Sequence, residues 1–140
     1  MSLKTFDPKQ TVMIVGTKII SGFADGSYIK LIRNEPMFAL KVGVDGEGTR
    51  AKSNNKSGRY EITLNQSSRS NDDLSAYAAA DELDNSGAVP VLLKDGSGRM
   101  IASSLTGWVQ KYPDVELAKE STMRTWIIES DEILIFIGGN

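Results

Sequence analysis

Cysteine and histidine are both absent from this chain of 140 residues. Without cysteine, the chain can form neither a disulfide framework nor a thiolate metal site. Without histidine, it lacks the commonest general base and every Ser-His or Cys-His arrangement for nucleophilic catalysis. No pair of carboxylates stands out at a spacing that converges on one point. We therefore expect a protein that is not an enzyme and that holds no cofactor or metal.

Long apolar runs are also missing. The longest, residues 133–137, is far too short to span a bilayer. Residues 1–8 are polar and lack the apolar core of a signal peptide. These features predict a chain that is made and kept in a cytoplasm-like compartment and has no membrane partner.

An excess of basic residues is the third absence. The chain has 16 Lys and Arg residues and 18 Asp and Glu residues. The resulting net charge of −2 argues against a protein that binds nucleic acid through its phosphates. The remaining composition, 40% hydrophobic and 24% charged, is ordinary for a globular protein. The length suits one domain with a proper core, so we expect residues 1–140 to form a single domain.

Short runs with strand-like alternation recur along the chain. They predict strands at residues 11–15, 18–20, 27–33, 38–44, 59–66, 88–94, 99–111, 123–129 and 132–137. Gly16-Thr17 is typical of a two-residue hairpin turn, and Pro90 indicates a sheet edge or a strand start. This pattern favours an antiparallel sandwich or barrel over a parallel α/β sheet.

One helix is predicted, at about residues 71–84. Ser70 is placed to cap its free amides and Asp73 to complete a capping box. Asn85-Ser86-Gly87 provides a stop, with Gly87 at the C′ position. We place the helix flat on the outside of the barrel. Three side chains are expected to face inward from it: Leu74, Tyr77 and Ala78.

The segment 45–58 separates two predicted strands and has almost no apolar side chain to bury. A loop of this length is uncommon in a compact domain and is usually disordered or functional. We predict that strands 38–44 and 59–66, each with one buried face, form a hairpin, and that the segment between them is an arm that becomes ordered on a neighbouring copy. The arm residues are Asp45, Gly46, Glu47, Gly48, Arg50, Lys52, Asn54, Asn55 and Lys56.

Two motifs in the arm have simpler explanations. Residues 46–51 (GEGTRA) match the letters of a dinucleotide-binding loop, but loop-forming residues follow where the chemistry needs a helix. Asp45 and Glu47 lack the third acidic ligand and the closing Glu of a calcium loop. We interpret both as a solvated turn.

Trp108 and Trp126 alternate with polar residues on predicted strands. Packing in the core or at an interface is the favoured interpretation of both side chains. A sugar-binding platform is the alternative.

Charge is unevenly distributed along the chain. Basic residues predominate between Lys41 and Arg59, and acidic residues predominate in the segment 114–132. The predicted helix carries five acidic residues and no basic one: Asp72, Asp73, Asp81, Glu82 and Asp84. A basic arm and an acidic body are complementary head to tail, and heterologous contacts of this kind build rings and stacks. The alternative is a solvated surface of uneven charge, which contributes little energy.

Three parts of the chain carry a family resemblance: MSLKTFDPK at residues 1–9, KVGVDGE through KSNNKSG at residues 41–58, and GGN at residues 138–140. With these residues the chain resembles the tail tube proteins of contractile-tailed bacteriophages. The resemblance covers nearly the whole chain, and the arm is its most specific part.

The resemblance implies a mainly β protein, an antiparallel sandwich or split barrel with one flanking helix. It implies six copies per ring, rings stacked into a tube, four strands per subunit in the channel lining, and an arm that reaches the adjacent ring. The implied partners are other copies, the tail sheath protein, and the baseplate and tail terminator proteins. Tape measure protein and genomic DNA would lie in the lumen without specific binding. The protein would be a virion component, assembled in the host bacterial cytoplasm.

Twenty-four strands about 4.8 Å apart, tilted by about 45°, give a barrel of roughly 50 Å backbone diameter, wide enough for duplex DNA. The expected lumen-facing residues are Ala39, Lys41, Glu61, Thr63 and Asn65. The acidic helix would meet the sheath or the arm of another ring.

Two other functions remain open. A baseplate or terminator component of the same fold would form a ring but no polymer. A carbohydrate-binding sandwich would use an exposed tryptophan.

Overall fold

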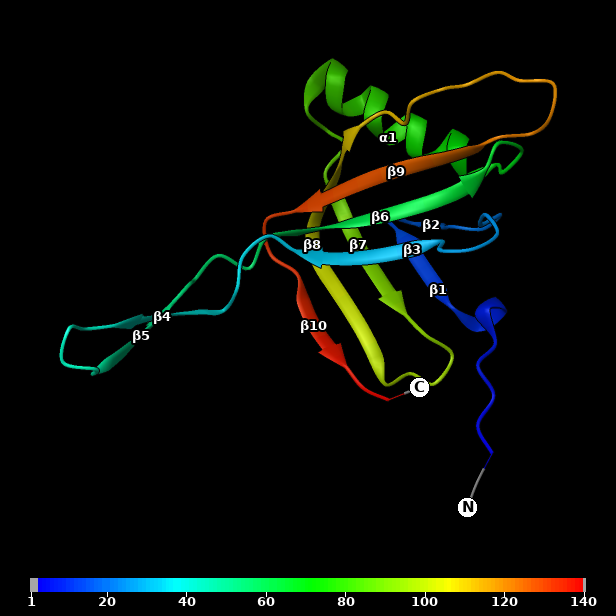
Figure 1. Cartoon of the computed structure of the whole chain (residues 1–140). Helices are drawn as coiled ribbons and strands as arrows, with labels where there is room; N and C mark the ends of the chain where they lie inside the picture. The colour runs from blue at the N-terminus through cyan, green and yellow to red at the C-terminus, as the bar shows by residue number, and fades with distance from the viewer. Residues whose placement is uncertain (1–2, 140) are drawn as a thin grey trace.

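The computed structural model describes residues 3–139, which fold into a β-rich body with one helix and a long projecting hairpin (Figure 1). The predicted domain and family motifs that include residues 1, 2 and 140 lie partly outside the described residues. The elements in chain order are η1 (Pro8–Gln10), β1 (Val12–Val15), β2 (Lys18–Ile19), β3 (Ile29–Arg33), β4 (Phe38–Val42), β5 (Gly48–Lys52), β6 (Gly58–Asn65), α1 (Ser70–Asp84), β7 (Val89–Lys94), β8 (Met100–Lys111), β9 (Met123–Ser130) and β10 (Leu134–Ile137).

The body is one antiparallel sheet in the order β2-β1-β7-β8-β9-β6-β3, with β10 also paired to β8. The long strand β8 joins the two halves of this sheet. Its first residues, Met100 to Ser103, pair with β10, and its last residues, Gly107 to Lys111, pair with β9. The predicted mainly β, antiparallel, split-barrel class is confirmed.

Alternation in the sequence decides which side of each strand is buried. In β6, Tyr60, Ile62 and Leu64 are fully buried, and the residues between them face outward. The hydroxyls of Tyr60 and Ser104 are 2.8 Å apart and hydrogen-bonded, which links β6 to β8 across the core. Other fully buried members of the core are Met13, Leu74, Ala102, Ile128 and Ile133.

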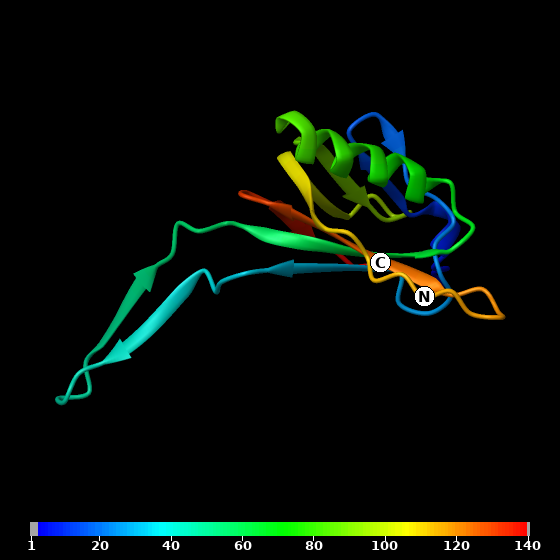
Figure 2. The same ribbon diagram turned by 90° about the horizontal axis from the view of Figure 1, so that it is seen from above.

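Helix α1 lies against one end of the sheet, as Figure 2 shows from above. Leu74 and Ala78 are buried and Tyr77 packs against the core, so the predicted inward face is confirmed. The Tyr77 hydroxyl donates to the Val15 carbonyl (3.1 Å) and accepts from the Thr17 amide (3.3 Å). The helix is therefore fastened to the turn between β1 and β2.

The predicted helix caps are wrong in detail. Ser70 is the first helical residue, and its hydroxyl accepts from the Ser21 amide (2.9 Å), so the hydroxyl is used in a tertiary contact and does not cap the helix. At the other end Asn85, not Gly87, takes the left-handed conformation (φ 63°). An Asn side chain tolerates this conformation better than most residues, and Asn85 comes first in the chain.

Pro90 is the second residue of β7, which lies between β1 and β8. The strand-start prediction for Pro90 is thus right and the sheet-edge prediction wrong. Its carbonyl accepts from the Gly16 amide (2.7 Å) at the β1–β2 turn.

No helix within residues 3–139 is long and apolar enough to cross a membrane.

Candidate functional site

The most unusual feature is the β4–β5 hairpin, which projects from the body in both views (Figures 1 and 2). Its two strands pair with each other in an antiparallel register that matches Leu40 with Arg50, and they form a separate two-stranded sheet. The tip is a turn in which Gly46 adopts φ 88°, a conformation that favours glycine. The Glu47 amide donates to the Asp45 carboxylate (3.1 Å) and stabilises this turn.

The hairpin exposes apolar side chains that its own body does not cover. Leu40 is 71% exposed and Val42 is 61% exposed. The Arg50 guanidinium lies 4.1 Å from the centre of the Phe38 ring, so one aromatic side chain is partly covered by a cation. Clustered exposed apolar side chains of this kind mark an interaction surface.

The root of the hairpin is anchored to the body. The Ser53 amide donates to the Met37 carbonyl (2.8 Å), and the Asn34 amide donates to the Ser57 carbonyl (3.0 Å). Closer to the sheet, the Ile133 amide donates to the Lys56 carbonyl (2.9 Å). These bonds fix the path of both connections where they leave the sheet.

The predicted partner of residues 38–44 is wrong. Strand β6 pairs with β3 and β9, whereas β4 pairs with β5, which lies inside the segment predicted to be an arm that becomes ordered on a neighbouring copy. Strand β4 pairs with the nearer segment because closing the short turn at residues 43–47 costs little conformational entropy. The prediction that residues 38–44 have a buried face is also wrong, since all of β4 is exposed.

The predicted arm residues are therefore distributed along one projection that runs from residue 34 to residue 57. Asp45, Gly46 and Glu47 form the tip, and Gly48, Arg50 and Lys52 belong to β5. Asn54, Asn55 and Lys56 lie in the return connection, where the Asn55 side-chain oxygen accepts from the Ser57 amide (3.0 Å). All nine residues are exposed.

The predicted lumen-facing set divides into two groups. Glu61, Thr63 and Asn65 share the outward face of β6, whereas Ala39 and Lys41 lie on the hairpin. On the outward face Glu61 forms an ion pair with Arg59 (3.3 Å). The hydroxyls of Thr63 and Thr125, on β6 and β9, are 3.2 Å apart. Which face lines a channel stays a prediction.

The five acidic residues of α1 differ in their surroundings. Asp72, Glu82 and Asp84 are exposed, and Asp73 and Asp81 are half-buried. The Asp81 carboxylate accepts from the Gly87 amide (3.1 Å), which supports the end of the helix.

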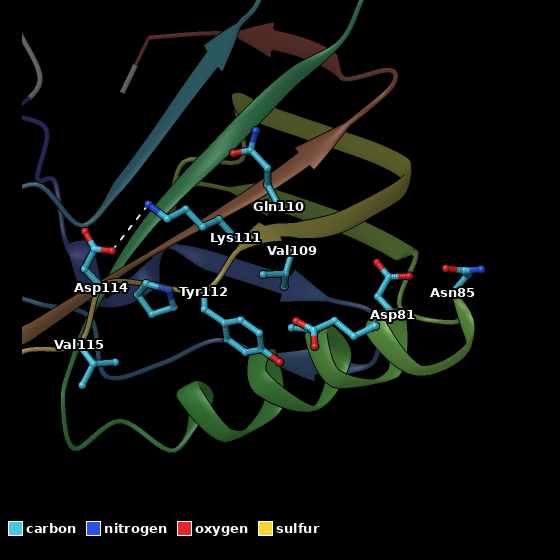
Figure 3. A pocket seen from close by; sticks show the side chains of 11 residues that line it. Asp81, Asn85, Val109, Gln110, Lys111, Tyr112, Asp114 and Val115 are labelled. Carbon is cyan, nitrogen blue, oxygen red and sulfur yellow. Dashed lines mark ion pairs between the residues drawn. The ribbon is translucent and has the colours of Figure 1, made fainter.

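A groove of about 770 Å³ lies between the helix and the end of β8 (Figure 3). Asp81 and Glu82 line one side of it, and Tyr112 lines the other. Lys111 and Asp114 form an ion pair of 3.6 Å at its rim. Both side chains are largely exposed, so this pair contributes little to stability.

Two shifted pKa values belong to the body and not to the hairpin. Burial raises the pKa of the Tyr60 hydroxyl, and its hydrogen bond to Ser104 opposes this effect in part. A hydrogen bond from the Ser97 hydroxyl lowers the pKa of the Asp95 carboxyl.

Within residues 3–139, no group of three or more acidic side chains is placed to hold a metal ion.

Trp126 lies in the core, and its indole nitrogen donates to the Asn71 side-chain oxygen (2.8 Å). Core packing is therefore confirmed for Trp126, and a sugar platform built on it is wrong. Trp108 is half-buried and lies opposite Glu129 of β9.

Sequence reasoning missed the apolar side of the hairpin. Residues 38–44 alternate apolar and polar side chains, and such alternation usually indicates a strand face that packs on the same chain, whereas here the apolar side chains are exposed. The half-buried Arg33 at the hairpin root was also missed. Nothing in the local sequence distinguishes this arginine from a solvated one.

Comparison with known proteins gives concordant results. The family model described as bacteriophage PhiTE tail tube protein matches residues 9–138. The curated protein "Structural protein ORF10" of Pseudomonas phage KPP10 is 26% identical over 144 residues, a match that covers 97% of this chain and 83% of the relative.

The fold is similar to solved structures of contractile injection systems at much lower sequence identity. The anti-feeding prophage tube-terminating cap matches with a TM-score of 0.64 at 7% identity, over 99% of this chain and 95% of the cap chain. The sheath/tube terminator of an extracellular contractile injection system, PVC, matches with a TM-score of 0.64 at 9% identity, over 98% and 100% of the two chains. A chain of the PVC sheath-tube complex matches with a TM-score of 0.60 at 9% identity, over 94% and 90%.

These structural likenesses establish the fold, whereas the family model covers nearly all of the sequence. This chain therefore belongs to the family of the bacteriophage PhiTE tail tube protein, a family of phage structural proteins and not a class of enzymes.

Proposed function

We propose that the protein is the repeating subunit of a phage tail tube, in which hexameric rings stack and the β4–β5 hairpin of each subunit contacts the adjacent ring. The observation that carries this proposal is that, within residues 3–139, the hairpin pairs with no other strand while it exposes Leu40 and Val42. A two-stranded hairpin alone is marginally stable in water, so a partner that covers its apolar side chains would stabilise it.

Open sheet edges support ring formation. Strand β3 pairs only with β6, and β8 beyond Gly107 pairs only with β9, so each leaves one edge without a strand partner among the described residues. Pairing of such edges between neighbouring subunits would close the sheets into a ring and remove exposed strand edges. Strands β8, β9, β6 and β3 would then supply the four strands per subunit that a barrel of 24 strands requires.

The outward face of these strands is our candidate for the lumen. Glu61, Thr63 and Asn65 lie on it, and Arg59 is paired with Glu61. On this face the exposed Lys30 of β3 lies opposite Glu61, so the cations have carboxylates beside them and DNA would pass without strong attachment. Ala39 and Lys41 are left out of this surface because they lie on the hairpin.

The acidic residues of α1 would lie on the outer surface of the tube. Asp72, Glu82 and Asp84 are exposed there and have no basic residue on the same helix. A contractile sheath with basic contact residues would be electrostatically complementary to this helix. The protein would then be a component of the virion tail.

A terminator ring is the second candidate function. Two of the similar structures are terminators, and their fold is shared with tube subunits. Both functions require rings, but only a tube subunit requires a polymer of rings. Electron microscopy of the purified protein separates them: we expect tubes of many stacked rings, and single rings at all concentrations would favour the terminator.

Removal of the hairpin tests the proposal directly. The Met37 carbonyl and the Ser53 amide are 2.8 Å apart, so residues 38–52 can be replaced by an Asn-Gly turn without moving the root. We expect this variant to keep the thermal unfolding midpoint of the body and to form no long tubes. Tubes of normal length from the variant would show that the hairpin is not the inter-ring contact.

A further inference from the structure

A pocket of about 410 Å³ lies at the root of the hairpin, where the hairpin meets β10. Its apolar lining comes from Met37, Phe38, Leu134 and Ile135, and its basic lining comes from Arg33, Lys52 and Lys56. Among the described residues no carboxylate lines this pocket, and the nearest one on the same connections, Glu35, accepts from the Ser53 hydroxyl at its edge (2.9 Å). It combines apolar walls with an excess of positive charge.

Arg33 contributes to the pocket a positive charge that no carboxylate of the pocket lining balances. This half-buried side chain donates through Nη2 to the Ile133 carbonyl (2.5 Å). Its Nε is buried and has no hydrogen-bond partner among the described residues. A partly desolvated guanidinium without a carboxylate is unfavourable, and an acidic group that enters the pocket would stabilise it.

The connection between β8 and β9 has the opposite chemistry. Residues 114–117 read Asp-Val-Glu-Leu and alternate acidic with apolar side chains. Val115 is 62% exposed and Leu117 is 79% exposed, and both acidic residues are exposed. The Thr122 hydroxyl donates to the Glu116 carbonyl (2.9 Å), so the backbone is held while the side chains point to solvent.

The pocket and this acidic segment lie at opposite ends of the molecule. In the β6–β9 pair, Gly58 lies opposite Ser130 at the hairpin end, and Asn65 lies opposite Met123 at the end where the β8–β9 connection returns. At about 3.4 Å per residue, the strands separate these ends by roughly 24 Å. Figures 1 and 2 show the hairpin and the connection on opposite sides of the body.

We infer that the root pocket of one copy receives residues 114–117 of the next copy, a contact that rests on the proposed stacking of rings. The acidic side chains would pair with Arg33, Lys52 and Lys56, and Val115 and Leu117 would meet the apolar walls. The two surfaces differ, so the contact is heterologous, and because they lie at opposite ends of one chain it would repeat from ring to ring along the proposed stack. It gives the stack a direction.

Charge reversal tests this pairing between copies. We expect Lys56→Glu alone and Glu116→Lys alone to lose tube formation, because each variant opposes like charges at every ring contact. A 1:1 mixture of rings formed separately by the two variants restores the complementary charge at every contact if the rings alternate, so we expect tubes to return. Lys4→Glu, an exposed reversal elsewhere, is the matched control and should assemble as the wild type does.

Disulfide trapping gives an independent readout, because the chain has no cysteine of its own. A chain with both Lys56→Cys and Leu117→Cys should form a ladder of disulfide-linked copies on oxidation of assembled tubes. Intact tubes without a ladder, together with normal tubes from both charge variants, would overturn the inference and leave the tube proposal in place. A wild-type protein that forms no tubes would overturn both.

Discussion

The indole nitrogen of Trp126 donates a hydrogen bond of 2.8 Å to the side-chain oxygen of Asn71, and both residues are buried. The Asn71 side-chain nitrogen in turn donates to the carbonyls of Asn65 and Ser68, each at 3.0 Å. One amide therefore joins β9, the first turn of α1, and the connection that follows β6.

Asn71→Ala should destabilise the body markedly. The substitution leaves the buried indole N–H without its acceptor, whereas the Asn65 and Ser68 carbonyls keep the backbone amides of residues 68 and 71 as donors. An unsatisfied buried group costs about 1–3 kcal/mol, so we expect a loss of about 2 kcal/mol. Urea unfolding followed by tryptophan fluorescence measures it. Asp72→Ala, at an exposed neighbouring position, is the control and should change the free energy of unfolding by less than about 0.5 kcal/mol.

Tyr60 should make stability depend on alkaline pH. Burial raises the pKa of its hydroxyl above the ordinary value of 10.0, so above that pH the unfolded chain releases a proton that the folded chain keeps. The stability that the neutral Tyr60 hydroxyl contributes to the folded state is present in full below pH 10.0 and is lost as the pH rises through the raised pKa.

We therefore expect the free energy of unfolding of the wild type to fall more steeply above pH 10 than that of Tyr60→Phe. At neutral pH this variant should cost about 1 kcal/mol, because the Ser104 hydroxyl loses its partner. Tyr112→Phe, at an exposed site, should follow the wild type. Equal slopes for wild type and Tyr60→Phe would contradict the prediction.

Gly58→Ala should destabilise the start of β6. A Cβ at this position would contact the carbonyl oxygen of Ile32 and would lie 2.9 Å from the Ile133 side chain. Backbone and core must shift to admit it, at a cost of about 1–3 kcal/mol. Thermal unfolding measures the loss, and Gly139→Ala, with open space around it, should be neutral.

Thr63→Lys tests the proposed lumen. It adds one cation per subunit opposite Thr125, where no carboxylate faces it, so assembled tubes should retain DNA at low salt and release it as salt is raised. Ser86→Lys adds the same charge just beyond α1, on the proposed outer side of the tube. Equal retention by the two variants in a DNA-protection assay would contradict a lumen on the β6 face.

Much of the body could be predicted from local pattern. The alternation of residues 59–66 and 123–129 has a physical cause in a sheet with one buried face, and both segments form strands that pair with each other. The inward residues Leu74, Tyr77 and Ala78 were predictable because helical spacing places them on one side. The pairing of strands was harder to predict from the sequence. Residues 38–44 alternate like a core strand, and only the formation of β5 shows that their partner is the neighbouring segment.

The amino-acid sequence by itself determined the fold class, the family and the absence of histidine and cysteine chemistry. Composition and periodicity are local properties, so they can be evaluated without knowing which distant segments are in contact. Tertiary structure alone decided where the strand edges are open, that the hairpin stands clear of its body, and that a basic pocket and an acidic segment lie at opposite ends. These features depend on which distant segments pair. Pairing is set by the balance of loop-closure entropy and buried surface over the whole chain, which no local stretch of sequence contains.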